Sequence, residues 1–310
     1  VVIITDSHVL EHYHHQFSEF PVVEIGFGEK NKTIATLEKI FSKFIEYEVD
    51  RSWFVVGIGG GIVCDVAGFA ASVYMRGLRF GFVSTTLLSQ VDASVGGKNG
   101  VNFQGYKNMV GVFNQPEFVI CDPEMLSTLD KQEFVSGFAE IIKAGAIRKP
   151  ELFNYLEMNI ESALNISSEV IEEIVYQSVL MKAEVVENDE KEKGERRILN
   201  FGHTFAHSFE KIGSMLHGEA VSLGMVLASE LSLKLGKLAP QDVRRIKDLL
   251  VKTGLPVNCD FDMKLVIETM KKDKKREGDH INLVLLNRIG GAIIYKTNIN
   301  QLEELVYDLC

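Results

Sequence analysis

The sequence lacks the features that mark secreted, membrane-spanning and disulfide-stabilised proteins. Its four cysteines are far apart and form no Cys-x-x-Cys pair, so we expect no disulfide framework. The chain does not open with a charged segment followed by an apolar one, as a secretory signal does, and we expect a reducing, cytoplasmic location. The longest apolar stretch, 54–75, contains Asp65 and several glycines. It is therefore a poor membrane span and predicts a buried strand, turn and helix instead.

The chain also has fewer positively than negatively charged residues. The chain has 33 lysines and arginines against 43 aspartates and glutamates, a net charge of -10 at pH 7. A surface that follows nucleic-acid phosphates is therefore not expected, and any anionic ligand must meet a local cluster of cations. With 310 residues and 46% hydrophobic side chains, the chain is long enough for two globular domains.

The first part of the chain alternates strand-like and helix-like patterns. Four short β-rich runs, at 1–5, 53–59, 79–85 and 118–122, predict buried strands of a parallel sheet. Between the first two runs, the stretch 32–48 carries apolar residues three and four apart, which predicts an amphipathic crossover helix. These residues are Ile34, Leu37, Ile40, Phe41 and Phe44.

Helical patterns dominate after about Leu129. They cover 133–147, 161–194, 200–236 and 241–254. The exception is 281–295, where Gly290 and Gly291 separate two β-branched runs and predict a hairpin. We expect an α/β N-terminal domain with a Rossmann-like parallel sheet over 1–129 and a mainly α-helical C-terminal domain over 130–310.

A glycine-rich stretch, 57–69, joins a strand run to a helical pattern. Glycines at such a junction let backbone N–H groups approach a phosphate at a helix N terminus. The glycines stand at 57, 59, 60 and 61 and do not match Gly-x-Gly-x-x-Gly, so the residues leave open a phosphate-binding loop and a tight structural turn. The stretch 84–101 adds hydroxyl groups, a second Gly-Gly pair and Lys98, which favours the phosphate-binding interpretation.

The eight histidines include two groups that could hold a metal. His12, His14 and His15 lie in a polar segment with only Glu11 and Glu19 nearby. We favour a solvated surface over a metal site there.

The second group contains His203, His207 and His217. The first two are four residues apart, so on a helix they share a face, as two zinc ligands do in His-Glu-x-x-His proteins. Threonine replaces the glutamate of that motif here, which excludes the metalloprotease interpretation. Glu140 and Glu219 are carboxylates that could complete a three-ligand site. Spacing leaves open which of these residues bind a metal and whether core hydrogen bonds satisfy some of the histidines.

Nine stretches along residues 1–290 together carry a family resemblance. They read GGGIVCDVAGFAAS, YMRGLRF, STTLLSQVDASVGGKNGVN, YKNMVGVFNQP, FAEIIKAG, MKAEVV, RRILNFGHTFAHSFE, LHGEAVSLGM and DKK. In this order and spacing they resemble the 3-dehydroquinate synthase family, sugar phosphate cyclases that use NAD and zinc. Members usually have a further segment before the position of Val1, so the resemblance implies a trimmed or unusually short chain.

The resemblance implies roles for individual residues. It assigns zinc, or Co²⁺ in its place, to Glu140, His203 and His217. It assigns NAD contacts to Asp6, Glu29, Lys32, Gly60, Gly61, Ile62, Asp65, Thr85, Thr86, Lys98, Lys107, Thr128, Leu129 and Glu133. It assigns substrate and catalytic contacts to Arg76, Asp92, Lys98, Asn108, Lys143, Lys182, Arg196, Asn200 and His207, with Lys274 or Lys275 near the phosphate. Arg76 would reach into the site of a neighbouring subunit, which implies a homodimer.

The implied activity is conversion of 3-deoxy-D-arabino-heptulosonate 7-phosphate to 3-dehydroquinate and phosphate in the shikimate pathway. NAD would oxidise the substrate transiently, phosphate would leave, hydride would return, and an intramolecular aldol reaction would close the ring. The protein would then be an NAD- and zinc-dependent carbon–oxygen lyase. The lysines and arginines assigned to the substrate offset the negative net charge where an anionic sugar phosphate must bind.

Three other interpretations compete with this one. A cyclase for a sugar phosphate without a carboxylate would not need Lys182 and Arg196, the expected carboxylate partners. A metal-dependent NAD polyol dehydrogenase of the same architecture would release reduced nicotinamide and would not need so many cations. A non-enzymatic NAD-binding module would need neither the metal set nor the cations. His8 and Ala93 depart from the frequent Asn and Ser of the family, which weakens the expectation of NAD contacts at those two positions.

Overall fold

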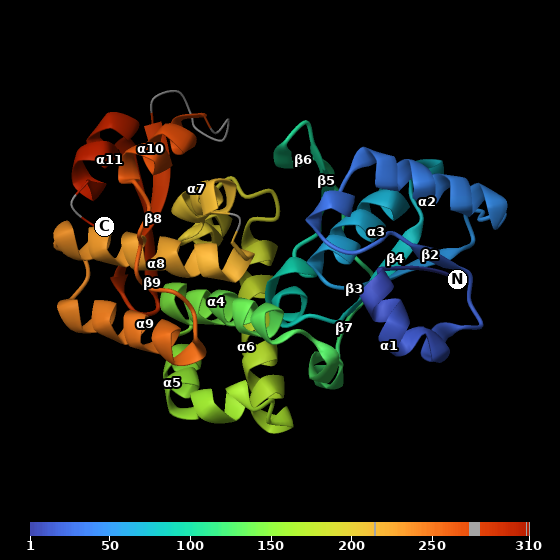
Figure 1. Cartoon of the computed structure of the whole chain (residues 1–310), viewed down its shortest axis with the longest axis horizontal. Helices are drawn as coiled ribbons and strands as arrows, with labels where there is room; N and C mark the ends of the chain where they lie inside the picture. Colours follow the sequence, from blue (N-terminus) through green and yellow to red (C-terminus); the bar gives the residue numbers. More distant parts are fainter. Residues whose placement is uncertain (214, 273–279, 308, 310) are drawn as a thin grey trace. The chain divides into compact units, whose positions relative to one another are not determined.

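The computed structural model describes residues 1–213, 215–272, 280–307 and 309. Internal contacts divide the chain into two compact units, Val1–Asp130 and Lys131–Cys310 (Figure 1). The first contains a parallel sheet with helices, and the second is mainly helical. The predicted fold class is therefore confirmed.

A five-stranded parallel sheet lies at the centre of the first unit (Figure 1). In spatial order its strands are β2 (Val22–Glu24), β1 (Val2–Thr5), β3 (Phe54–Gly59), β4 (Arg79–Ser84) and β7 (Val119–Cys121). The four predicted strands are confirmed as β1, β3, β4 and β7. β2 escapes sequence prediction because a three-residue strand is too short to show a period.

Helices cover both faces of this sheet. They are α1 (Ser7–Phe17), α2 (Ile34–Glu46) and α3 (Gly61–Val73). Successive side chains of a strand point to opposite faces: Val2 and Ile4 of β1 pack in one core with α2 and α3, whereas Ile3 packs with Val9 of α1. The predicted stripe of α2 is confirmed, because Leu37, Ile40 and Phe44 are buried in the first of these cores.

The connections create a topological switch point between β1 and β3. The chain leaves β1 through α1 to β2 on one side, then passes through α2 to β3 on the other side of β1. In an open parallel sheet, ligands bind outside the carboxyl ends of the strands at such a point. Thr5 and Ile58 are partners in the register of β1 and β3. Asp6 and Gly60, which follow these strands, therefore lie at one edge of the sheet.

A hairpin of β5 (Lys98–Phe103) and β6 (Tyr106–Phe113) contacts α3. Gln104 and Gly105 form its turn with φ angles of 48° and 80°. The sequence pattern does not predict the hairpin because β6 is exposed along most of its length and lacks a buried face. The short turns of the unit are η1 (Glu29–Asn31), η2 (Tyr74–Arg76), the π-helical η3 (Ser89–Ala93) and η4 (Pro123–Thr128).

Helices make up most of the second unit (Figure 1). They are α4 (Lys131–Ile147), α5 (Pro150–Leu164), α6 (Ser168–Asn188), α7 (His203–Gly213), α8 (His217–Lys234), α9 (Pro240–Thr253), α10 (Met263–Lys272) and α11 (Ile299–Val306), with the 3-10 turn η5 (Glu195–Asn200). The predicted hairpin is confirmed as β8 (His280–Arg288) and β9 (Gly291–Asn298). The single helical stretch expected over 161–194 is wrong, because it is divided between α5 and α6 and ends in a turn.

α4 is buried along most of its length and contacts α5, α6, α8 and α9. A helix with neighbours on all sides is normally apolar all round. Glu140 and Lys143 are exceptions, and each is only 2% exposed. Burial of two charges costs several kcal/mol per ion before they are paired, so these positions require partners. In the described part of the chain, no helix is long and apolar enough to cross a membrane.

Candidate functional site

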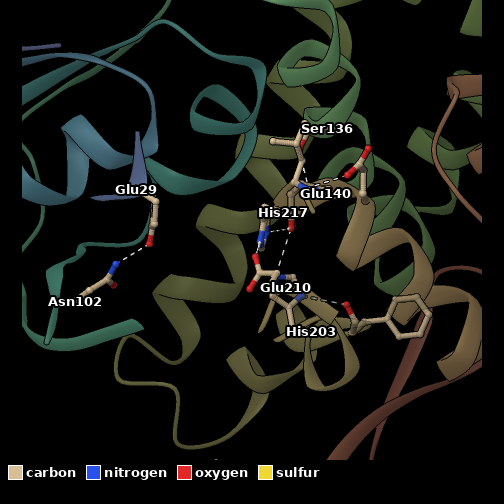
Figure 2. A network of polar contacts seen from close by, with 11 residues as sticks. Glu29, Asn102, Ser136, Glu140, His203, Glu210 and His217 are labelled. Carbon is tan, nitrogen blue, oxygen red and sulfur yellow. Dashed lines mark hydrogen bonds and ion pairs between the residues drawn. The ribbon is translucent and has the colours of Figure 1, made fainter. Parts of the chain in front are cut away.

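Three side chains from three helices of the second unit point toward one another (Figure 2). Glu140 lies in the middle of α4, His203 is the first residue of α7 and His217 is the first residue of α8. The Nε2 atom of His217 lies 3.2 Å from Oε1 of Glu140, and Nε2 of His203 lies 3.4 Å from the same oxygen. Both imidazoles therefore face one carboxylate.

This arrangement fits a metal ion. One ligand atom from each of the three residues lies within 4.8 Å of the other two, and within residues 1–213, 215–272, 280–307 and 309 no other three ligating side chains do so. Two histidines and a carboxylate form the usual three-ligand set of a catalytic zinc site, which keeps a further position open. His12, His14 and His15 are exposed on α1.

Glycines bring the three helices close together. Gly202 has a φ of 80°, which lets the chain turn into α7. A Cβ on Gly224 of α8 would lie 2.0 Å from the carbonyl oxygen of Gly202, and a Cβ on Gly218 would lie 2.1 Å from that of Ser136 in α4. The backbone N–H of Gly218 donates to Ser136 Oγ at 2.9 Å. Only glycine therefore lets the first turn of α8, with His217, approach α4.

His207 and Glu219, the other two possible metal ligands in the sequence, lie near this group but are not part of it. The rings of His203 and His207 are 6.0 Å apart on α7, as expected from their spacing, but His207 is not part of the three-ligand group. Glu219 Oε2 accepts the backbone N–H of Leu216 at 2.9 Å and thereby caps α8. The structure thus brings together the three residues that the family resemblance implies.

The charged groups of this cluster shift one another's pKa values. Burial alone would raise the pKa of Glu140, but the ion pair with Lys143 and the contacts with His203 and His217 lower that pKa well below its ordinary value. Burial and the charge of Lys143 lower the pKa of His203. Glu140 is therefore an anion and His203 a neutral imidazole near neutral pH, the states in which both bind a metal.

His217 has a second carboxylate partner that the sequence analysis missed. Its Nδ1 lies 3.0 Å from Oε1 of Glu210 on α7. Burial opposes protonation of His217, but hydrogen bonds to Glu140 and Glu210 outweigh it and raise the pKa of His217 to about 9. The sequence spacing could have indicated this residue, because Glu210 follows His203 by seven residues, or two helical turns, and so lies on the same face of the helix.

Binding of a metal to the metal-free protein is expected to strengthen as the pH rises from about 6.5 to about 9. The metal must displace a proton from His217, whose pKa is about 9 instead of 6.5. Because this pKa is raised, protonation stabilises the metal-free fold fully below about pH 6.5, and the contribution is lost as the pH rises through about 9. Titration with Co²⁺ at several pH values, with proton release recorded, measures the effect. Affinity that stays constant or falls over this range would contradict it.

Buried cations lie on neighbouring elements of the same unit. Lys182 on α6 and Arg196 on η5 are 7% and 2% exposed, and both elements contact α4. Asp189 was missed by the sequence analysis, yet it accepts backbone N–H groups from residues 193, 194 and 196 and so fixes the turn that carries Arg196. Asn200 donates to Glu192, a second residue that was missed.

Several residues expected to bind NAD gather at the carboxyl edge of the sheet. Asp6 caps α1 through a 2.9 Å hydrogen bond from the N–H of Val9. Thr85 and Thr86 follow β4, and the N–H of Thr85 donates to the carbonyl of Gly59 at 3.0 Å. Gly60 and Gly61 mark the start of α3. These residues surround the switch point from three adjacent strands.

The glycines of this turn also have a packing role. A Cβ on Gly59 would lie 2.4 Å from Val63, and one on Gly60 would lie 2.9 Å from Thr86. A Cβ on Gly61 would lie 2.9 Å from that of Ala93. Close packing alone therefore accounts for glycine at these positions, and both sequence interpretations of the loop agree with the structure.

Two side-chain contacts involve residues expected to bind NAD. Lys32 is buried and forms an ion pair with Asp65 on α3, one turn after Ile62. Glu29 accepts a 2.7 Å hydrogen bond from Nδ2 of Asn102 (Figure 2). Oδ1 of Asn102 accepts the backbone N–H of Asn108 at 2.9 Å.

The remaining expected residues are spread over both units. Arg76 is exposed at the end of η2 with a φ of 70°, Asp92 lies in η3, Lys98 begins β5 and Lys107 lies on β6. Thr128 Oγ1 lies 2.8 Å from the Tyr13 hydroxyl, Leu129 follows η4 and Glu133 lies in the first turn of α4. His8 packs edge-on against Phe27. Lys274 and Lys275 lie outside the described residues.

The two units define a class of fold. A parallel-sheet unit precedes a mainly helical unit, and solved structures of cyclases and dehydrogenases share this fold. The structure of 2-epi-5-epi-valiolone synthase from Streptomyces hygroscopicus subsp. jinggangensis 5008, with NAD⁺ and Zn²⁺ bound, is similar with a TM-score of 0.90 and 27% identity over 99% of this chain and 90% of that one. A 2-deoxy-scyllo-inosose synthase complexed with carbaglucose-6-phosphate, NAD⁺ and Co²⁺ has a TM-score of 0.88 and 26% identity over 99% and 90%. A probable glycerol dehydrogenase from Sinorhizobium meliloti 1021 shares the fold, with a TM-score of 0.68 and 15% identity over 99% and 89%.

Comparison with family models and curated sequences identifies the family to which the chain belongs. Residues 22–136 match the model of the 3-dehydroquinate synthase N-terminal domain, and residues 137–276 match that of the C-terminal domain. The 3-dehydroquinate synthase of Campylobacter concisus is 43% identical over 88% of this chain and 79% of that protein. That of Nitrosospira multiformis is 41% identical over 95% and 84%. The chain belongs to the 3-dehydroquinate synthase family, which confirms the resemblance drawn from the sequence.

Proposed function

We propose that this protein converts 3-deoxy-D-arabino-heptulosonate 7-phosphate to 3-dehydroquinate and phosphate, as an NAD- and metal-dependent lyase. The observation that carries the proposal is the group of Glu140, His203 and His217 beside buried cations in an otherwise acidic chain. The relatives named 3-dehydroquinate synthase, at more than 40% identity over most of the chain, support it.

Glu140, His203 and His217 would hold the metal, with zinc as the expected ion and Co²⁺ as a substitute. When bound, such a metal polarises a carbon–oxygen group and lowers the pKa of a coordinated hydroxyl. Glu140 supplies the negative charge, and its partner Lys143 keeps that carboxylate ionised. We also propose a substrate contact for Lys143, whose ammonium group pairs with the Glu140 carboxylate.

The switch point of the sheet would hold NAD. When bound, NAD accepts a hydride from the substrate and later returns it. Gly60, Gly61 and Ile62 would present the N terminus of α3 to the pyrophosphate. Asp6, Glu29 and Lys32 lie at the ends of the strands or on the segment after β2, where they can meet the ribose and adenine. The other NAD contacts are proposed for Asp65, Thr85, Thr86, Lys98, Lys107, Thr128, Leu129 and Glu133.

The substrate carries a carboxylate and a phosphate, and buried cations match those charges. Lys182 and Arg196 would bind the carboxylate, and the planar guanidinium suits bidentate contacts. Asn200 and His207, near these cations or near His203, would bind hydroxyl groups. We also propose substrate contacts for Arg76, Asp92, Lys98 and Asn108, with Arg76 supplied by the second subunit of a homodimer. We also propose a cytoplasmic location for the enzyme.

Two other activities share much of this chemistry. The similarity to cyclases whose names refer to valiolone and inosose products favours a sugar phosphate without a carboxylate. The fold shared with a probable glycerol dehydrogenase favours a polyol. The presence of both Lys182 and Arg196, the cations expected to bind a carboxylate, argues for a substrate that carries one.

One assay distinguishes these activities. The purified protein, loaded with NAD and Zn²⁺, is given the heptulosonate phosphate, and inorganic phosphate and reduced nicotinamide are recorded together. We expect phosphate release without net formation of reduced nicotinamide, and loss of turnover on thorough removal of the metal by a chelator, with recovery when Zn²⁺ or Co²⁺ is added. Net nicotinamide reduction would point to a dehydrogenase. Release of phosphate only from a sugar phosphate without a carboxylate would point to another cyclase.

A further inference from the structure

His217 lies between two carboxylates (Figure 2). Its Nε2 atom faces Glu140 Oε1 at 3.2 Å, and its Nδ1 atom faces Glu210 Oε1 at 3.0 Å. The two contacts use opposite sides of the ring. Glu140 is a candidate metal ligand, whereas Glu210 contacts the side of His217 that points away from the metal position.

We propose that Glu210 is a positioning residue for the metal, acting through His217. A neutral imidazole carries one N–H, and the group that accepts this hydrogen bond decides which nitrogen keeps a lone pair. Nδ1–H of His217 donates to Glu210, so the proton that a metal displaces is the one on Nε2, and the Nε2 lone pair would then point at the metal position. A carboxylate in this role also fixes the ring orientation and makes the ligating nitrogen more basic.

His203 has the same tautomer for a different reason. Its Nδ1 lies 3.2 Å from the backbone carbonyl oxygen of Phe201, and its Nε2 faces Glu140. Both histidines therefore present Nε2 to the same point. The backbone supports one of them, whereas the support of His217 depends on a side chain that a point substitution can remove.

The position of Glu210 follows from the helix that carries it. Glu210 and His203 are seven residues apart on α7, so they lie on one face of the helix, two turns apart. The Glu210 side chain is only 6% exposed, and a buried carboxylate needs a cationic or hydrogen-bonding partner. One helix thus supplies a ligand to the metal and the support for a ligand on α8.

This inference rests on the metal that the proposed function requires, and not on the substrate. It is tested on the metal-free chain of residues 1–310 by titration with Co²⁺ against a competing chelator, with the visible absorption of bound Co²⁺ as the signal. We expect Glu210→Ala to weaken Co²⁺ binding by about 10- to 100-fold. Glu210→Gln keeps an oxygen acceptor for Nδ1–H and loses the charge, so its Co²⁺ affinity should lie between those of Glu210→Ala and the unmodified chain.

A matched control is Glu230→Gln, which neutralises a carboxylate of α8 that pairs with Lys247 instead of His217. It should leave Co²⁺ affinity unchanged. Unchanged Co²⁺ affinity in both Glu210 variants would overturn the inference, and so would a loss that far-ultraviolet circular dichroism traces entirely to unfolded protein. If the Glu210 variants bind Co²⁺ weakly while the unmodified, metal-loaded chain releases no phosphate, the inference stands and the proposed function fails.

Discussion

Replacement of Glu140 by glutamine is expected to abolish tight metal binding and to lower kcat/KM by about 10³-fold or more, equivalent to about 4 kcal/mol of transition-state stabilisation. Glutamine has nearly the same shape, so the packing of α4 is retained. It removes the only negative charge among the three candidate ligands and leaves a neutral amide where both Nε2 atoms now face a carboxylate oxygen. Phosphate release from the heptulosonate phosphate and Co²⁺ titration measure the two effects.

The same substitution should also destabilise the metal-free protein. Lys143 is 2% exposed and forms an ion pair with Glu140, and loss of one partner of a buried pair costs about 3–5 kcal/mol. Urea unfolding of the metal-free variant measures this change. The double variant Glu140→Gln with Lys143→Met should recover much of the stability without recovering Co²⁺ binding. Full metal affinity in Glu140→Gln would contradict the role of this carboxylate.

Replacement of Gly218 by alanine is expected to damage the fold and the metal centre together. The new Cβ would lie 2.1 Å from the carbonyl oxygen of Ser136, and two backbones would have to move apart. We expect a loss of about 3 kcal/mol or more in the free energy of unfolding. Because His217 directly precedes Gly218, the displacement of α8 also moves this ligand away from Glu140, and metal affinity should fall by more than tenfold.

Ser136→Ala is the comparison for this prediction. It removes the hydroxyl that accepts the N–H of Gly218 but introduces no clash, so we expect a smaller loss of about 1–3 kcal/mol for the unsatisfied donor. Thermal unfolding and Co²⁺ titration of both variants give the ranking. Equal stability of Gly218→Ala and the unmodified chain would show that α8 does not need its close approach to α4.

Much of the fold follows from local patterns. The four runs that form β1, β3, β4 and β7 are short, apolar and separated by helix-like stretches, a pattern that predicts buried parallel strands. The stripe of α2 and the paired glycines of the β8–β9 hairpin are equally local signals. β2 and the β5–β6 hairpin escape prediction because neither contains a buried periodic face.

Local sequence patterns predict less of the candidate site. Helical periodicity pairs His203 with His207, because a period reports neighbours on one helix only. The other two residues of the candidate metal site are His217, at the start of the next helix, and Glu140, which lies 63 residues before His203 in the chain. Family resemblance supplies this set of three residues where periodicity cannot.

By itself, the sequence determined the class of fold and the strand–glycine–helix junction, because these depend on neighbours within a few residues. The residues expected to hold a metal or NAD came from the family resemblance. Only the tertiary structure decided that Glu219 caps α8, that Glu210 contacts His217, and that Gly218 and Gly224 bring three helices into contact. The glycine contacts join segments far apart in the chain, and the contacts of Glu219 and Glu210 depend on how a helix begins and how two successive helices meet, which no local period records.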